Sequence, residues 1–173
     1  MKIRVYLACG LTHVPARDFE SYVSGIHLLA REFEDQGCEV RYALVDSDPQ
    51  LASYPESQRA RLCYEWDRRM VEWSSLVVAE SSYPSTGMGI ELQIAADRNI
   101  PIVFLINRKF GKLADRKLYE LGDGSVHELQ IGDRMVSLMA LGLPNVIGQI
   151  VFDDTSASRR RVVARTLEAR GRN

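Results

Sequence analysis

The sequence predicts an α/β fold, a three-layer αβα sandwich with a mainly parallel, Rossmann- or flavodoxin-like sheet of about five strands. Short apolar segments over 3–9, 76–79 and 100–106 have the composition of strands buried on both faces of a sheet. Segments with helical spacing of apolar residues alternate with them, as in a parallel sheet covered by helices. The 173 residues fit a single domain, 1–173, and 46% hydrophobic residues suffice for its core.

The order of the expected elements follows from apolar spacing and from the positions of glycine and proline. Apolar residues recur at helical spacing over 16–36, and Gly37 ends this pattern as a C-cap glycine would. A polar, proline-marked loop over 46–56 is long enough to form the rim or lid of a ligand site. The other elements expected before residue 107 are strands over 3–9, 40–45, 76–79 and 100–106 and helices over 56–73 and 90–98.

The residues after 107 give weaker signals. They contain a Lys-rich segment, a turn at 122–124, a possible strand over 126–131 and a closing helix after Asp153. Six arginines fall in the last fifteen residues, with Glu168 as the single acid. Contact with an anionic ligand or a nucleic acid is one explanation, and an amphipathic helix with a solvated basic face is the simpler one.

Charge and cysteine content exclude several classes of function. The 22 basic and 23 acidic residues leave a net charge of −1, so no electrostatic footprint for nucleic-acid polymers is present. Cys9, Cys38 and Cys63 form no CxxC pair, which argues against a disulfide framework and a zinc site and suits a reducing compartment. No stretch approaches the roughly 20 apolar residues of a membrane span, and the first apolar run is too brief for a secretion signal. We therefore expect a cytoplasmic protein without a membrane partner.

A turn-forming segment after the strand that ends at Glu80 carries two closely spaced glycines. Gly87 and Gly89 let the backbone approach a ligand closely, and the helix that follows directs its free amides and positive dipole end toward it. An anion such as phosphate suits this corner. Ser85 and Thr86 add hydroxyl donors, although N-capping of a purely structural turn would select the same residues.

Two carboxylates are placed where they could meet near this turn. Glu91 lies two residues past Gly89, where the alternative is a solvated first-turn Glu that complements the helix dipole. Asp67 in the preceding helix could reach the same strand ends, or could pair with Arg68 or Arg69 on the surface. Glycosidic cleavage has an oxocarbenium-like transition state, in which a carboxylate captures C1 while an acid protonates the leaving group. Two converging carboxylates would suit that chemistry.

The segment LVVAESSYPSTGMGIELQIA, preceded by YEWDRRMVEW, resembles the nucleoside 2-deoxyribosyltransferase-like superfamily and, within it, the 2'-deoxynucleoside 5'-phosphate N-hydrolases. The shared pattern is an acidic residue ahead of the third strand, a V-V-A-E strand and then P-S-x-G-x-G-x-E-L. The resemblance implies that Glu91 is the nucleophile of a glycosyl-enzyme intermediate and that Asp67 orients the sugar or handles the proton of the departing base. The residues implied to hold the 5'-phosphate are Ser85, Gly87 and Gly89.

The resemblance extends to single residues elsewhere in the chain. Tyr6 matches the tyrosine of the family's first strand that lies near the nucleophile, and a core aromatic is the alternative. The family is generally dimeric, and a serine of the neighbouring subunit completes the phosphate site in the N-hydrolases. Asp123-Gly124-Ser125 resembles that segment, which an ordinary turn would also explain. The resemblance therefore implies a homodimer with its site near the interface, and no metal or organic cofactor.

The first loop departs from the family pattern. Relatives carry a glycine directly after Tyr-x-Ala or Tyr-x-Cys, whereas here Cys9 takes that place and Gly10 follows. Gly10 stays a candidate for substrate binding, as a glycine in a loop after a strand. No arginine stands at the matching place in 11–14, so His13 or Arg17 would have to serve, and a plain loop histidine is the alternative.

Three functions stay open on the sequence. The leading one is hydrolysis of a nucleoside 5'-monophosphate, in its ribo or 2'-deoxy form, to free base and sugar 5-phosphate. A nucleoside 2-deoxyribosyltransferase would share the Glu91 intermediate, but an enzyme for unphosphorylated nucleosides has no need of an anion-binding turn. A non-catalytic nucleotide sensor is the third, against which the presence of Glu91, Asp67 and Tyr6 speaks. The aromatics that could stack on a base or belong to the core are Trp66, Trp73 and Tyr83.

Overall fold

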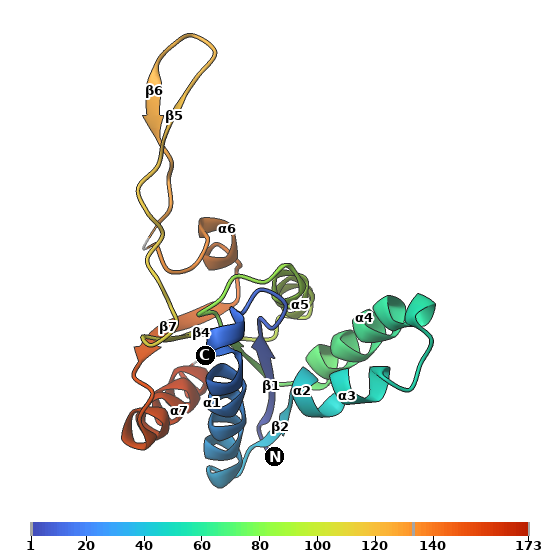
Figure 1. Cartoon of the computed structure of the whole chain (residues 1–173). Helices are drawn as coiled ribbons and strands as arrows, with labels where there is room; N and C mark the ends of the chain where they lie inside the picture. The colour runs from blue at the N-terminus through green and yellow to red at the C-terminus, as the bar shows by residue number, and fades with distance from the viewer. Residues whose placement is uncertain (1, 133, 173) are drawn as a thin grey trace.

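A five-stranded parallel sheet forms the centre of the computed structural model, which describes residues 2–132 and 134–172. The order of its strands is β2-β1-β3-β4-β7, and each neighbouring pair is parallel. Helices cover both faces of the sheet (Figure 1), which confirms the predicted α/β sandwich. The strands are β1 (Arg4–Cys9), β2 (Glu39–Arg41), β3 (Leu76–Glu80), β4 (Ile102–Asn107) and β7 (Val146–Phe152).

Two long helices pack on each face of the sheet. Helices α1 (Ala16–Asp35) and α7 (Ser156–Gly171) cover one face, and α4 (Glu56–Trp73) and α5 (Thr86–Asp97) cover the other. Successive side chains of a strand point to opposite faces. Tyr6 of β1 therefore lies in the layer of α4 and α5, whereas its neighbours in the strand pack under α1 and α7.

The segment after β2 differs from the prediction. The predicted strand over 40–45 ends at Arg41, and two short helices, α2 (Ala43–Asp46) and α3 (Asp48–Leu51), follow it. The Oδ2 atom of Asp46 accepts a hydrogen bond of 3.0 Å from the backbone N–H of Tyr42, an amide that a helix start would otherwise leave free. This local hydrogen bond favours a helix where apolar content alone indicated a strand. Helix α3 occupies part of the predicted loop over 46–56.

Helix α5 begins four residues earlier than predicted. Ser85 is its N-cap, and the Ser85 Oγ atom accepts a hydrogen bond of 3.2 Å from the backbone N–H of Met88. Gly87 and Gly89 therefore lie inside the first turn of the helix instead of in a turn that precedes it. The capping hydroxyl favours this start of the helix, although glycine has a low helix propensity.

The last third of the chain holds the largest difference. The fifth strand of the sheet is β7, which the sequence analysis missed because Gly148 and Gln149 interrupt its apolar run at the sheet edge. The possible strand over 126–131 is β6 (Val126–Glu128), which pairs antiparallel with β5 (Leu118–Glu120) outside the sheet. This hairpin projects from the body of the molecule (Figure 1). The predicted closing helix is confirmed as α7, and α6 (Leu138–Leu141) precedes β7.

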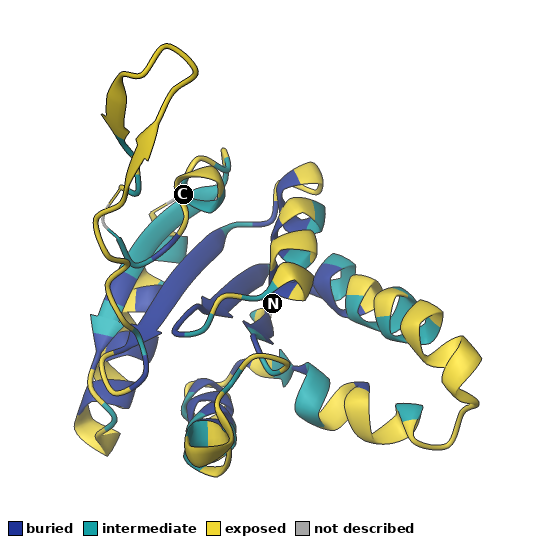
Figure 2. Ribbon diagram, turned by 45° about the horizontal axis from the view of Figure 1, so that its top comes forward, coloured by how far each residue is buried: buried dark blue, intermediate teal, exposed yellow. Residues whose placement is uncertain are grey.

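Burial is concentrated in the sheet and in the helix faces that cover it. Figure 2 shows buried strands at the centre, with exposed residues along the hairpin and the outer half of α4. In α7 the apolar residues Val162 and Val163 are buried, but so is Arg159, which pairs with Asp154 at 2.9 Å, so the predicted solvated basic face does not include that arginine. Within the part of the chain that the structure describes, no helix combines the length and apolar character needed to cross a membrane.

A buried carboxyl group ties three elements together at the carboxyl end of β3. Glu80 is only 2% exposed, and its Oε2 atom accepts a hydrogen bond of 2.6 Å from the hydroxyl of Tyr22 in α1. Its Oε1 atom accepts from the hydroxyl of Ser82 and, at 3.4 Å, from the backbone N–H of Asn107 at the end of β4. Burial raises the pKa of Glu80, and these donors oppose that effect.

We predict that Tyr22→Phe lowers the free energy of unfolding by about 1–3 kcal/mol, because a buried carboxyl oxygen loses its donor while the ring contacts with Tyr83 and Phe110 persist. Urea denaturation monitored by circular dichroism measures the change. The matched control is Tyr119→Phe in the exposed hairpin, for which no comparable loss is expected. Equal stabilities of the two variants would contradict the role given to the Tyr22 hydroxyl.

Candidate active site

Glu91 points from α5 toward β1 and is held there by one hydrogen bond. Its Oε1 atom accepts a hydrogen bond of 2.9 Å from the hydroxyl of Tyr6. Its Oε2 atom is buried and has no hydrogen-bond partner among the described residues. Burial raises the pKa of Glu91 to about 7, while the Tyr6 hydrogen bond lowers it and the nearby Asp67 raises it. The solvated first-turn glutamate considered above is therefore not what the structure contains.

Asp67 points from α4 into the same region. Its Oδ1 atom accepts a hydrogen bond of 2.7 Å from the hydroxyl of Ser47, and its Oδ2 atom accepts one of 3.4 Å from the thiol of Cys63. Burial raises the pKa of Asp67, these two hydrogen bonds lower it, and Asp48 raises it further. The carboxyl group is thus held on both oxygens by donors of the protein.

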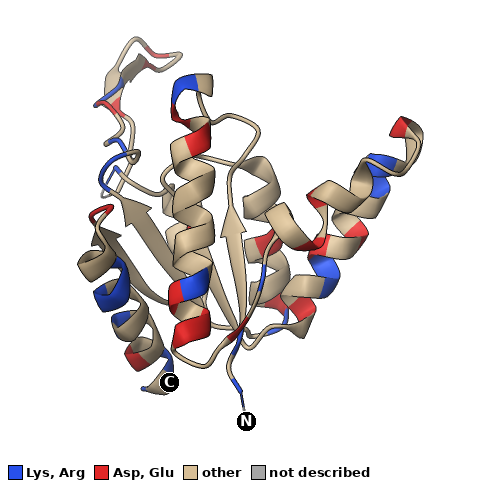
Figure 3. Ribbon diagram, turned by 60° about the horizontal axis from the view of Figure 1, so that its bottom comes forward, with Lys and Arg blue, Asp and Glu red and all other residues tan. Residues whose placement is uncertain are grey.

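The surface pairing considered for Asp67 does not occur. Arg68 pairs with Glu72 at 3.0 Å, and Arg69 pairs with Glu65 at 3.5 Å. Both pairs join residues four apart on α4, where charges of both signs follow one another along the exposed surface (Figure 3). Arg68 and Arg69 therefore do not pair with Asp67, whose hydrogen-bond donors are the hydroxyl of Ser47 and the thiol of Cys63.

The two carboxyl groups line one cavity of about 170 Å³ between α4 and α5. Tyr64 and Ile90, which are 48% and 49% exposed, add an apolar wall to it. The cavity is lined by Ala60, Cys63, Tyr64, Asp67, Arg68, Gly87, Ile90, Glu91 and Ile94. A small pocket with two acids and an apolar wall can hold a sugar ring beside a flat apolar group.

The residues expected to hold a phosphate are divided between two faces of α5. Gly87 lines the cavity of Glu91, whereas Ser85, Gly89 and His13 line a second cavity of about 640 Å³. Because successive residues of a helix are 100° apart, Ser85 and Gly89 face the side of α5 away from Glu91. The second cavity also contains Lys112 and Arg134 among its lining residues. Gly87 and Gly89 therefore line two different cavities on opposite sides of α5.

Gly10 allows the loop after β1 to pack closely on the start of α5. A Cβ atom at this position would lie 3.0 Å from the Cβ atom of Ser85 and 3.0 Å from the carbonyl oxygen of Tyr83. Such distances are shorter than ordinary van der Waals contacts, so a side chain at this position would require Ser85 or the Tyr83 carbonyl group to shift by a few tenths of an ångström. Gly10 thus acts on the site through the position of Ser85.

Ser125 lies far along the chain's projecting hairpin. It is exposed, and its hydroxyl donates a hydrogen bond of 2.6 Å to the carboxylate of Asp123 within the turn. Figure 1 shows this hairpin extending away from the helices that carry the two acids. Within one chain, Ser125 and Glu91 are therefore not brought together.

The three aromatics considered for a base pocket all have other partners. Trp66 packs edge-on against Tyr54 with ring centres 5.5 Å apart, and Trp73 lies under the guanidinium of Arg41 at 4.2 Å. The hydroxyl of Tyr83 donates to Asp18 at 3.0 Å. The aromatic that lines the Glu91 cavity is Tyr64, which the sequence analysis did not single out. Its spacing of three residues from Asp67, on one face of a helix, is the signal that could have identified it.

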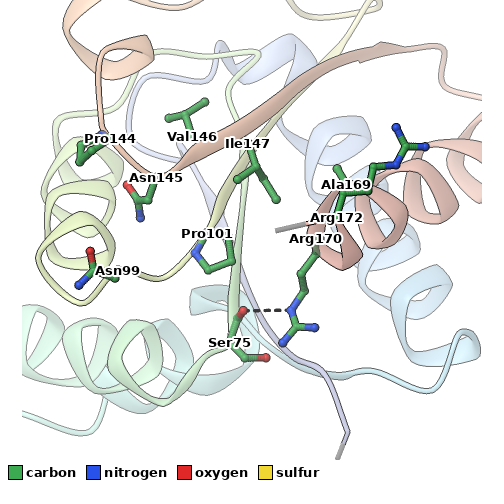
Figure 4. A pocket seen from close by; sticks show the side chains of 10 residues that line it. All are labelled: Ser75, Asn99, Pro101, Pro144, Asn145, Val146, Ile147, Ala169, Arg170 and Arg172. Carbon is green, nitrogen blue, oxygen red and sulfur yellow. Dashed lines mark hydrogen bonds between the residues drawn. The ribbon is translucent and has the colours of Figure 1, made fainter.

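Another hollow lies at the amino ends of β3, β4 and β7 (Figure 4). It measures about 910 Å³, and the Nε atom of Arg170 donates across it to the carbonyl oxygen of Ser75 at 3.2 Å. Its ten lining residues include no carboxylate. Among the residues that the structure describes, no group of three or more His, Cys, Asp and Glu side chains could hold a metal ion.

Comparison with known proteins finds a relative by sequence and further relatives by structure. The chain is 30% identical over 107 residues to a protein of Thermofilum pendens (strain DSM 2475 / Hrk 5) named "Putative 2'-deoxynucleoside 5'-phosphate N-hydrolase 1", an alignment that covers 62% of this chain and 70% of the relative. No family model matches the chain.

Two solved structures share the fold. The Clostridium botulinum CMP N-glycosidase BcmB aligns with a TM-score of 0.54 and 20% identity over 93% of this chain and 97% of its own. A conserved protein from Enterococcus faecalis V583 aligns with a TM-score of 0.56 and 17% identity over 100% of both chains. At these identities the two structures support the fold alone.

We predict that Glu91→Gln stabilises the protein above about pH 5. The ordinary pKa of 4.5 rises to about 7 on folding, so the folded protein keeps a proton that the unfolded chain releases between these values. Wild-type stability therefore falls as pH rises from about 4.5 to about 7, and the variant, which has no acid to ionise at this position, avoids that loss.

Urea unfolding at pH 5 and pH 8 measures this difference. The variant should exceed the wild type clearly at pH 8 and only slightly at pH 5. Glu168→Gln, at a side chain that is 64% exposed, is the control and should show no such dependence. A Glu91→Gln variant no more stable than the wild type at pH 8 would contradict the burial of an ionisable group there.

Proposed function

Because the chain belongs to the nucleoside 2-deoxyribosyltransferase-like superfamily, we propose that it is an enzyme that hydrolyses the N-glycosidic bond of a nucleoside 5'-monophosphate. The products are a free base and a sugar 5-phosphate, and the sugar is ribose or 2'-deoxyribose. One observation carries the proposal: the half-buried acids Glu91 and Asp67 line a single cavity. The name of the Thermofilum pendens relative supports the choice of a nucleotide as substrate.

Glu91 is the nucleophile in this proposal. Its ionised carboxylate attacks C1' of the sugar, the C1'–N bond breaks, and the electron pair of that bond leaves with the base, which takes up a proton. The oxygen of water then bonds to C1', the bond to Glu91 breaks to release the carboxylate, and the proton lost by water replaces the one that the base took up. Because Tyr6 binds Oε1 and Oε2 has no partner among the described residues, Oε2 is the oxygen free to attack.

The other parts of the cavity suit the remaining parts of a nucleotide. Asp67 orients the sugar or supplies the proton to the departing base. Tyr64 and Ile90 offer an apolar wall for the flat face of the base. Gly87, which has no side chain, leaves room for the 5'-phosphate beside the first turn of α5. The capping bond from Ser85 to the amide of Met88 keeps that turn in place.

We predict that purified protein releases free base from nucleoside monophosphates and that Glu91→Gln lowers this rate by about a thousandfold or more. The assay follows base by chromatography over a panel of ribo- and deoxyribonucleotides and nucleosides, with and without an acceptor base. The control variant Glu168→Gln should keep wild-type activity.

The other outcomes of this assay identify the other functions. A new nucleoside formed with the acceptor base would identify a deoxyribosyltransferase instead. Binding without turnover would favour a nucleotide sensor. Full activity of Glu91→Gln would refute Glu91 as the nucleophile.

The proposal includes a homodimer in which Ser125 of one subunit reaches the phosphate bound by the other. An isolated two-stranded hairpin is marginally stable in water, and this one exposes four apolar side chains. They are Leu118, Tyr119, Leu121 and Val126. A second subunit would cover these side chains, and the exposed Ser125 of the first subunit would then lie near the active site of the second. A single domain over 1–173 and a cytoplasmic location stay predictions.

We predict that two weakened variants restore each other when mixed. In a mixed dimer of Glu91→Gln and Ser125→Ala, one site combines an intact Glu91 with an intact Ser125, so up to about a quarter of the wild-type activity should return after subunit exchange. The assay runs at substrate concentrations below KM, and sedimentation velocity reports the oligomer. Activity that stays at the mean of the two separate variants would argue against a shared site.

A further inference from the structure

A buried serine from a different part of the chain holds the second carboxyl group of the site. We propose that Ser47 is a positioning residue, whose hydroxyl fixes the carboxyl group of Asp67 in the orientation that faces the Glu91 cavity. This inference rests on the proposed function, in which Asp67 contacts the substrate. It assigns a role to the segment of α2 and α3, which carries no residue of the cavity wall itself.

The geometry around Ser47 is that of a specific contact. Ser47 is 1% exposed, although it lies in a polar connecting segment, and its Oγ atom is 2.7 Å from the Oδ1 atom of Asp67. It occupies the junction between α2 and α3 with φ −140° and ψ −53°, outside the helical range, so that neither short helix continues through it. A buried hydroxyl requires a partner, and Asp67 is the one it has.

The other oxygen of Asp67 has a weaker donor. Cys63 precedes Asp67 by one helical turn of α4, and its thiol lies 3.4 Å from Oδ2. Thiols are weak hydrogen-bond donors, whereas a hydroxyl bound to a carboxylate forms a strong, charge-assisted bond. The orientation of the carboxyl group therefore depends chiefly on Ser47.

The charges around Asp67 do not replace this bond. The groups that face it are Asp48 from α3, Cys63 from α4, Glu91 from α5, and Tyr6 and Cys9 from β1. All of them are acidic or neutral at pH 7. Within 2–132 and 134–172, no Lys or Arg forms an ion pair with Asp67. Its ionised form is therefore stabilised by hydrogen bonds alone.

A second contact lets the role of the hydroxyl be tested without loss of the segment. The ring of Tyr54, beyond α3, packs against Trp66 of α4 with centres 5.5 Å apart. This contact is independent of Ser47, so the segment should stay docked when the hydroxyl is removed. Ser47→Ala should therefore alter the orientation of the Asp67 carboxyl group more than it alters the packing of the segment on α4.

We predict that Ser47→Ala lowers kcat by about tenfold and shifts the pH–rate profile, because Asp67 loses the donor that orients it and favours its charged form. Ser47→Thr, which keeps a hydroxyl, should recover most of the activity. Ser53→Ala, at an exposed serine of the same segment, is the matched control and should behave as the wild type.

A double-mutant cycle separates positioning from a structural role. If Ser47 acts through Asp67, then Ser47→Ala should cause no further loss of kcat in an Asp67→Asn background. Equal losses in both backgrounds would overturn the proposal, and so would full activity of Ser47→Ala beside an impaired Asp67→Asn variant.

Carbon-13 NMR titration of the Asp67 carboxyl group tests the contact without any substrate. Ser47→Ala should raise the pKa of Asp67, because the hydrogen bond that lowers it is lost. Ser53→Ala should leave it unchanged. An unchanged pKa in Ser47→Ala would overturn the positioning role, whereas a shifted pKa in a protein that cleaves no nucleotide would leave the contact intact and refute the proposed function instead.

Discussion

The burial of the Glu91 carboxyl group against the Tyr6 hydroxyl is the interaction on which the rest of the site depends. It joins α5 to β1 across 85 residues of sequence and leaves one carboxyl oxygen without a partner among the described residues. Burial of an ionisable group costs free energy whenever that group is charged, and a pKa near 7 expresses this cost. In the proposed mechanism this oxygen without a partner is the one that attacks C1'.

Two glutamates with raised pKa values differ in how their carboxyl oxygens are hydrogen-bonded. Glu80 and Glu91 both have a raised pKa because of burial. Both oxygens of Glu80 accept hydrogen bonds, from Tyr22 of α1, from Ser82 just after β3 and from the backbone of Asn107 at the end of β4. Glu91 has a single donor and faces a cavity. The two carboxyl groups therefore differ in how many of their oxygens are satisfied by donors, and the partly satisfied one lines the cavity.

The fold places the two acids by simple means. Tyr6 faces the layer of α4 and α5 because alternate residues of β1 face alternate sides of the sheet. The N-cap of Ser85 sets where α5 begins, and Gly10 lets the preceding loop approach it. From that start, the 100° step between helical residues directs Glu91 toward α4 and Gly89 away from it. Helix α5 therefore lies between two cavities, and neighbouring residues of the glycine-containing motif line different ones.

The sequence by itself determined the α/β alternation, the bounds of α4 and the presence of two acids near a glycine-rich helix start, because these follow from apolar period, capping and local motif. Only the tertiary structure decided that β7 completes the sheet, that Tyr64 lines the cavity and that Ser47 holds Asp67. The pairing of β7 and the bond from Ser47 are contacts between segments that are distant in the chain. The position of Tyr64 depends on which face of α4 turns toward α5. Such contacts depend on how whole elements pack: local spacing can show that Tyr64 and Asp67 share a helix face, but not which element that face meets.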